Sequence, residues 1–102
     1  MSIKKQFLKT RPVCKVTFRL TKDEAGDAET VHLVGDFNDW DTTATPMKHL
    51  KSGDFKAILD LDLETEYQFR YLIDEEKWVN EEDADKLVDT PYPDVENSVI
   101  AT

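Results

Sequence analysis

The alternation of apolar and polar positions predicts two long strands. In residues 13–20 every second side chain is apolar, as in a half-buried strand: Cys14, Val16, Phe18 and Leu20. Residues 67–73 repeat this pattern, with Tyr67, Phe69, Tyr71 and Ile73 on one face and Gln68, Arg70 and Leu72 on the other. We therefore expect Arg70 to point away from the core.

Shorter apolar runs predict the remaining strands. The β-branched run 31–34 forms one, residues 46–50 pair with 55–61 across a turn at Gly53, and short strands lie at Trp78 and at 97–100. Residues 22–29 are expected to form a solvated turn, and the acidic residues 80–94 a long surface loop with at most one helical turn. Six to seven or more short strands without helical periodicity predict an all-β fold, an antiparallel β-sandwich.

The chain length of 102 residues fits a single domain. Residues 1–12 show no strand pattern and are expected to form a flexible lead-in, whereas residues 13–102 form the β-sandwich domain. Lys9 and Arg11 interrupt the start of the chain before an apolar stretch of signal-peptide length develops. Because Cys14 is the only cysteine, no internal disulfide can form, and the expected location is the reducing cytoplasm.

The net charge of the chain narrows the classes of partner that it can be expected to bind. The formal net charge is −9, with 22 acidic against 13 basic residues. Such a field repels phosphate backbones and anionic lipid, so we expect neither nucleic acid nor a membrane as partner. A neutral ligand is not repelled, which leaves uncharged sugars, peptides and other proteins.

Residues with catalytic chemistry are scattered. His32 and His49 are isolated, and no glycine-rich phosphate loop is present. The neighbouring carboxylates Asp60, Asp62, Glu64 and Glu66 fit a solvated acidic face, and those at Asp83, Asp85 and Asp89 lack the pattern of a calcium loop. We expect no enzyme activity, no metal site and no cofactor.

The two tryptophans are the strongest candidates for binding. Trp40 lies in a polar corner and Trp78 follows an acidic turn, so each either caps the core or forms part of an exposed aromatic platform. A platform of this kind suits a pyranose, whose apolar face stacks on an indole. Arg70 and Asn97 could bind the sugar hydroxyls, although a surface cation and a turn residue are equally ordinary explanations for them.

Four segments in order resemble the glycogen-binding domain of AMP-activated protein kinase β subunits and the early-set domains of branching enzymes and isoamylases, grouped as family 48 carbohydrate-binding modules. They are residues 31–40 (VHLVGDFNDW), 55–61 (FKAILDL), 67–74 (YQFRYLID) with Trp78, and 96–100 (ENSVI). The resemblance covers roughly residues 13–100. It implies an immunoglobulin-like sandwich.

The resemblance also implies roles for individual residues. Trp40 and Trp78 would stack on glucose, Arg70 would contact hydroxyls where the kinase subunits typically have lysine, and Asn97 would open the last strand. Tyr92 is a candidate contact, in a loop where those subunits carry an apolar residue. The turn before Trp78 lacks the usual glycine and looks longer.

These features lead to one main hypothesis and two alternatives. The chain is expected to bind α-glucans such as glycogen, starch and maltooligosaccharides without catalysis, and to serve a protein partner such as a glycogen-metabolising enzyme or a kinase. Neither a catalytic barrel nor a kinase-docking segment follows, so the module either stands alone or serves an enzyme separated from it. Alternatively, the chain is an immunoglobulin-like protein-interaction module or regulatory subunit that has lost sugar binding, with Trp40 and Trp78 at its interface. A hydrolase acting through surface carboxylates ranks far behind.

Overall fold

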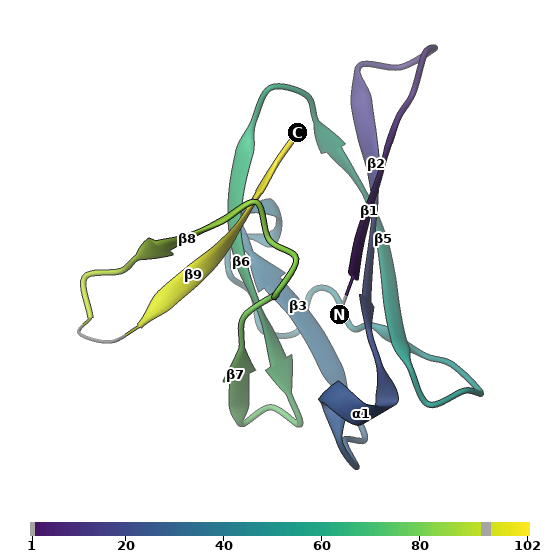
Figure 1. Cartoon of the computed structure of the whole chain (residues 1–102), viewed down its shortest axis with the longest axis vertical. Helices are drawn as coiled ribbons and strands as arrows, with labels where there is room; N and C mark the ends of the chain where they lie inside the picture. Colours follow the sequence, from purple (N-terminus) through teal and green to yellow (C-terminus); the bar gives the residue numbers. More distant parts are fainter. Residues whose placement is uncertain (1, 93–94) are drawn as a thin grey trace.

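The computed structural model describes residues 2–92 and 95–102, and within them nine strands form two facing antiparallel sheets (Figure 1). The first sheet has the order β1-β2-β5-β4, with bounds Ser2–Phe7, Val13–Leu20, Phe55–Asp62 and Lys48–His49. The second has the order β3-β6-β9-β8, with bounds Val31–Gly35, Glu66–Ile73, Glu96–Ala101 and Lys86–Asp89, and β7 (Lys77–Val79) also pairs with β6. This arrangement is the predicted all-β sandwich.

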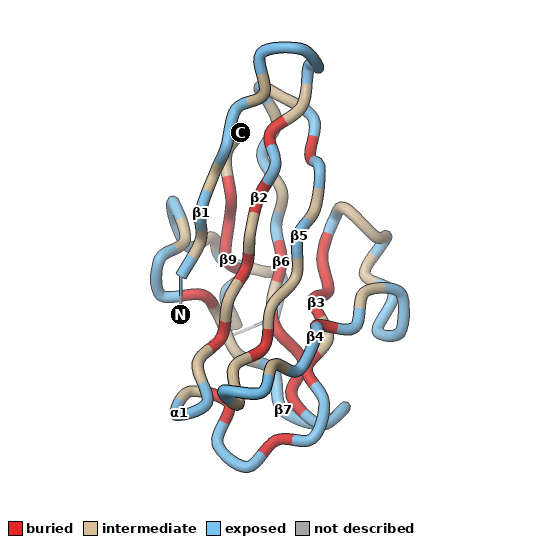
Figure 2. Tube along the Cα trace, turned by 90° about the vertical axis from the view of Figure 1, so that its right-hand side faces the viewer, coloured by how far each residue is buried: buried red, intermediate tan, exposed pale blue. Residues whose placement is uncertain are grey.

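The core lies between the sheets and follows the predicted alternation. Figure 2 shows buried and more exposed positions alternating along β2. The ring of Phe18 meets that of Phe69 edge-on, with 5.3 Å between centroids, and Tyr71 is fully buried beside them. The contact between Phe18 and Phe69 joins β2 of one sheet to β6 of the other. Burial of each such side chain contributes about 1.5–3 kcal/mol of stability.

The flexible lead-in expected for residues 1–12 is wrong for half of its length, because Ser2–Phe7 forms β1 along the edge of β2. Ile3 packs against the core opposite Phe18. Lys5 obscures the alternation in the sequence: it lies opposite the buried Val16, and its ammonium reaches Asp85 at 2.8 Å. A long lysine can cover apolar surface with its methylenes while its charge stays outside.

Two other segments also differ from expectation. The expected solvated turn begins with one helical turn, α1 (Lys22–Ala25), because Thr21 and Glu24 cap each other's backbone N–H groups. The expected acidic loop contains β8, which pairs with β9. Its side chains are mostly exposed on both faces, so this edge strand leaves no apolar pattern in the sequence.

The remaining predicted strands are present, although the pairing expected for residues 46–50 is limited to β4 (Lys48–His49), because Pro46 pairs with His32 of β3 instead. The hairpin between β4 and β5 turns at Gly53, whose φ of +95° suits glycine. No helix among the described residues is long and apolar enough to cross a membrane.

The second edge of β6 is divided between two partners. Its first half pairs with β9 from Glu66 to Phe69, and its last three residues pair with β7. On the other side β6 pairs with β3. The outer face of one strand therefore adjoins side chains from β3, β7 and β9, and four of the predicted site residues gather there: Trp40, Arg70, Trp78 and Asn97.

Candidate functional site

Gly35 ends β3 where two strands approach closely. A Cβ at this position would lie 2.5 Å from the carbonyl oxygen of Gln68 and 2.6 Å from the Cβ of Phe69. Both obstacles are tied to the backbone of β6, so only glycine fits. Phe37, two residues later, packs its ring near those of Phe18 and Phe69, which anchors the corner to the core.

Asn38 closes the corner through its carboxamide. Its Oδ1 accepts a hydrogen bond from the backbone N–H of Gly35 at 3.1 Å, and its Nδ2 donates to the Leu33 carbonyl at 2.8 Å and to the Thr45 hydroxyl at 2.9 Å. These bonds satisfy backbone groups that the end of β3 leaves unpaired. The chain can therefore turn sharply before Trp40.

Trp40 is held in a defined orientation. It and the preceding Asp39 both have a φ of +57°, which few residues other than glycine adopt. The indole Nε1 donates to one oxygen of Asp36 at 2.8 Å, and the other oxygen accepts from the backbone N–H of Gln68 at 2.8 Å. The Asp36 carboxylate thus fixes the indole relative to β6.

Trp78 reaches the same face from β7. It lies opposite Leu72 of β6 and is 40% exposed. The preceding turn has positive φ at Asp74 and Glu75, at 50° and 62°, a conformation that glycine adopts most readily. The Asp74 carboxylate supports this backbone by accepting the N–H groups of Glu29 and Thr30 at 2.8 and 3.0 Å. The missing glycine therefore does not displace Trp78 from β6.

Arg70 lies between the two indoles. Its guanidinium carbon is 4.7 Å from the ring centroid of Trp78 and 5.8 Å from that of Trp40, within the range of cation–π attraction. As predicted, its side chain leaves β6 on the outer face, opposite Val34. Burial lowers the pKa of Arg70, but a guanidinium in a protein remains charged. Arg70 thus joins the two tryptophans in one surface.

Asn97 lies on the same face, at the start of β9. It is buried, and its Nδ2 donates to the side-chain oxygen of Gln68 at 3.0 Å. Its Oδ1, the Nε of Arg70 and the Nδ1 of His32 are buried without a hydrogen-bond partner among the described residues. An unsatisfied buried donor or acceptor costs about 1–3 kcal/mol. All three atoms are closed to solvent, so a ligand hydroxyl would reach them only if the surrounding side chains moved.

Tyr92 is not joined to the other four residues. It is 71% exposed in the segment after β8, where its backbone N–H donates to the Thr90 hydroxyl at 3.2 Å. Within residues 2–92 and 95–102, its ring makes no aromatic contact with Trp40 or Trp78. Pro93 and Asp94, in the same loop, lie outside the described residues.

Sequence reasoning missed the residues that support these side chains. Gln68 holds Asn97, and Asp36 holds Trp40. Gln68 lies two positions before Arg70, so the two-residue period of the strand was a signal that could have identified it. A shallow hollow continues the surface beyond Trp78 and is lined by Thr42, Thr43, Leu72, Glu75 and Trp78.

The cysteine and one of the histidines considered as candidate catalytic groups are part of the packing of the fold. Cys14 is buried in the core, and the ring of His49 stacks on Phe55 with 4.2 Å between centroids. Among the residues described, no three His, Cys, Asp or Glu side chains are grouped as metal ligands would be.

Two tryptophans and an arginine gathered on one outer face of a β-sandwich form the kind of surface on which a sugar can stack, as expected of a carbohydrate-binding module. Residues 15–92 match the model of the family described as carbohydrate-binding module 48 (isoamylase N-terminal domain). The chain belongs to this family, which confirms the resemblance and the immunoglobulin-like type of its sandwich. No curated protein matches the chain.

Family membership defines the general activity. The chain is a carbohydrate-binding module, and a module of this family is not catalytic by itself. The matched range includes Trp40, Arg70 and Trp78 but ends before Asn97, so a role for Asn97 rests on the geometry.

Proposed function

We propose that this module binds α-glucans, among them glycogen, starch and maltooligosaccharides, on the surface formed by Trp40, Arg70, Trp78 and Asn97. The observation that carries the proposal is the position of Arg70 between the two indoles. Neighbouring sugars of one chain would stack on the two rings, and the guanidinium between them would donate to their hydroxyls. Tyr92 remains a candidate for a further contact.

The polar atoms on this surface support a sugar ligand over a purely apolar one. The Nε of Arg70 is a buried donor and the Oδ1 of Asn97 a buried acceptor, and neither has a partner among the described residues. An apolar protein surface docked here would also cover the remaining N–H groups of the Arg70 guanidinium without pairing them, whereas sugar hydroxyls can accept from those groups. The choice of α-glucan follows from the family, whose description names the isoamylase N-terminal domain.

The charge of the chain is compatible with this ligand. A net charge of −9 does not repel a neutral polymer, and binding should depend little on salt. We further propose that the chain is not itself an enzyme, that it works in the cytoplasm, and that it brings a glycogen-metabolising enzyme or a kinase to the polymer. The free, buried Cys14 suits a reducing compartment.

The test is native electrophoresis with and without glycogen in the gel. We expect the folded parent to be retarded, and Trp40→Ala and Trp78→Ala each to lose the retardation. Phe7→Ala is the matched control, because this exposed aromatic side chain lies on the other sheet. Unretarded migration of the parent would contradict the proposal and favour the protein-interaction alternative.

A further inference from the structure

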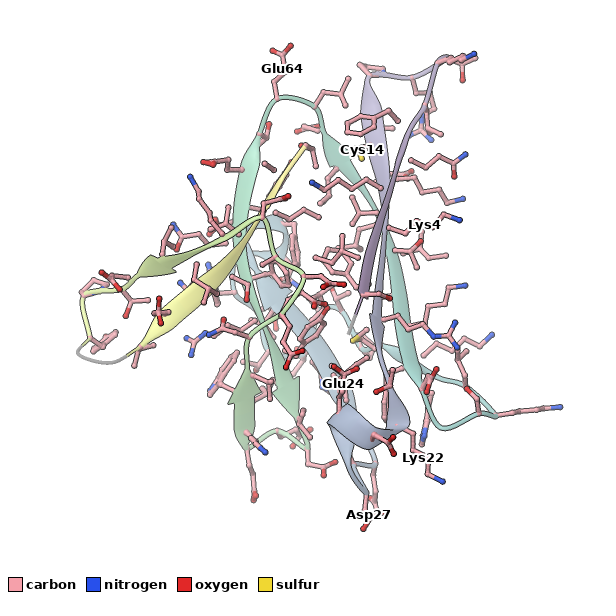
Figure 3. The ribbon with its side chains drawn as sticks, viewed as in Figure 1. Lys4, Cys14, Lys22, Glu24, Asp27 and Glu64 are labelled. Carbon is pink, nitrogen blue, oxygen red and sulfur yellow. The ribbon has the colours of Figure 1, made fainter. Side chains whose placement is uncertain are left out.

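The outer face of the sheet β1-β2-β5-β4 is basic, although the whole chain is acidic. Because Cys14, Val16, Phe18 and Leu20 face the core, the residues between them face outward. The neighbouring strands add their own outward cations, so that the face carries Lys4, Lys15, Arg19, Lys48 and Lys56 against the carboxylates of Asp60 and Asp62 on β5. In Figure 3 side chains with nitrogen tips, Lys4 among them, project from this sheet away from the other one.

Three of these cations form a continuous row. Arg19 of β2 lies directly opposite Lys56 of β5, which lies directly opposite Lys48 of β4. Side chains directly opposite in an antiparallel pair have Cβ atoms about 4.5–5.5 Å apart, and like charges there are destabilising. The row therefore weakens the fold.

Nearby carboxylates neutralise only one end of this row. Arg19 donates two hydrogen bonds to Asp54, at 3.0 and 2.7 Å. Neither Lys48 nor Lys56 has an ion-pair partner in the described part of the chain. Two ammonium groups on adjacent strands are thus left for an external anion.

Protection of sheet edges does not explain the row. Lysines on edge strands often prevent unwanted strand pairing, which would account for Lys48 on β4. Arg19 and Lys56, however, lie on β2 and β5, which have neighbours on both sides. A cation there has no edge to protect.

Apolar surface adjoins the two unpaired lysines. A hollow of 310 Å³ is lined by Lys48, Leu50, Lys56, Ala57 and Ile58, and Ile58 is 47% exposed although it lies mid-strand. A ligand that matches this surface carries anionic groups beside an apolar one.

We propose that this face docks an acidic segment of another protein, whose carboxylates pair with Lys48 and Lys56 and whose apolar side chain covers Ile58. Polyanions such as nucleic acid or anionic lipid fit less well, because the net charge of −9 repels their dense charge and they offer no apolar group to Ile58 at the surface. The face belongs to the sheet that does not carry Trp40 and Trp78. It is therefore available while the other sheet holds a sugar.

The test is fluorescence anisotropy with a labelled peptide of Glu-Glu-Leu repeats. We expect the parent to bind it at low salt and to release it as salt rises. Lys48→Gln and Lys56→Gln should each weaken binding by about two- to fivefold. Lys77→Gln makes the same change of charge on the other sheet and should bind as the parent does.

Further measurements separate this proposal from its rivals. Lys56→Gln should be at least as stable to urea as the parent, because it relieves repulsion in the row, and its retardation by glycogen should be unchanged. The proposal is overturned if the peptide fails to bind at low salt, if Lys77→Gln weakens binding equally, or if Lys56→Gln loses stability. It is also overturned if phosphatidylserine vesicles or duplex DNA bind this face and the peptide does not.

Discussion

The guanidinium carbon of Arg70 lies 4.7 Å from the centroid of the Trp78 ring, although the two residues come from different strands. The contact presents a cation and an aromatic face side by side on one surface. A guanidinium is planar and can stack on an indole while its N–H groups still donate at its edge. The contact therefore orders Trp78 before a sugar binds.

Two replacements of Arg70 should distinguish the contribution of its charge to sugar binding from that of its planar shape. Arg70→Leu removes every donor and should weaken binding of maltoheptaose by about tenfold or more, equivalent to about 1.4 kcal/mol. Arg70→Lys keeps the charge but loses the planar stack, so an intermediate loss is expected. Titration calorimetry would measure both, and equal affinity of Arg70→Leu and the parent would contradict a role for Arg70 at the sugar.

The corner should not tolerate a methyl group at Gly35. A Cβ there would lie 2.5 Å from the Gln68 carbonyl oxygen, and we expect Gly35→Ala to cost about 3 kcal/mol or more in urea unfolding. Gly26→Ala is the control, because the added Cβ meets nothing within 4 Å and only the backbone conformation, with φ of +65° and ψ of −139°, penalises it, by about 1–3 kcal/mol. Equal losses in the two variants would show that the close approach at β6 is not the cause.

Glu81 should make the chain less stable as the pH rises. It is buried, accepts the Tyr71 hydroxyl at 2.7 Å and the Asp83 N–H at 2.9 Å, and burial raises its pKa above the usual 4.5. Because the folded state holds this proton more tightly, the contribution to stability is full below 4.5 and is lost as the pH rises through the folded pKa.

The free energy of unfolding of Glu81→Gln in urea, measured from pH 4.5 upward through the folded pKa of Glu81, should depend less on pH than that of the parent. This holds whatever the absolute stability of the variant. Glu76→Gln, an exposed change in the turn before β7, should keep the slope of the parent. A Glu81→Gln profile parallel to that of the parent would rule out this origin of the slope.

Asp54 should make the chain more stable as the pH rises, the opposite of the effect expected for Glu81. Hydrogen bonds from Arg19 and from the backbone N–H of Lys22 lower its pKa below the usual 3.8. Its contribution to stability is therefore present above 3.8 and lost as the pH falls through the lower folded pKa. Asp54→Asn should be less stable than the parent at neutral pH and approach it in acid.

The same variant bears on the basic face. Without Asp54 the positive charge of Arg19 is no longer compensated, so Asp54→Asn should bind the acidic peptide more tightly than the parent in the anisotropy assay. Weaker binding would indicate that Asp54 helps to shape the face rather than to neutralise it.

Strands whose apolar residues alternate could be predicted from the sequence, and strands that depend on a distant partner could not. β2 and β6 each have one buried face, which leaves a two-residue period. β1 and β8 are edge strands: the period of β1 is broken by Lys5, and β8 is largely exposed. Their pairing with β2 and β9 is a tertiary contact that local patterns do not encode.

The candidate site shows the same division. Trp40, Arg70 and Trp78 could be selected one by one from their polar surroundings and from the family resemblance. That Arg70 lies between both rings depends on the register of β3, β6 and β7, which the sequence does not show. The unsatisfied Oδ1 of Asn97 likewise became visible only once the partner of its Nδ2, Gln68, was known.

The division of the second edge of β6 between β9 and β7 affects which insertions and deletions the chain can survive. One residue added within β6 would turn every later side chain to the opposite face, bringing Arg70 into the core and Phe69 or Tyr71 to the surface. Folding and sugar recognition would fail together. In the loop at residues 8–12, which joins β1 to β2 on the other sheet, length changes should accumulate among related chains while the length of β6 stays constant.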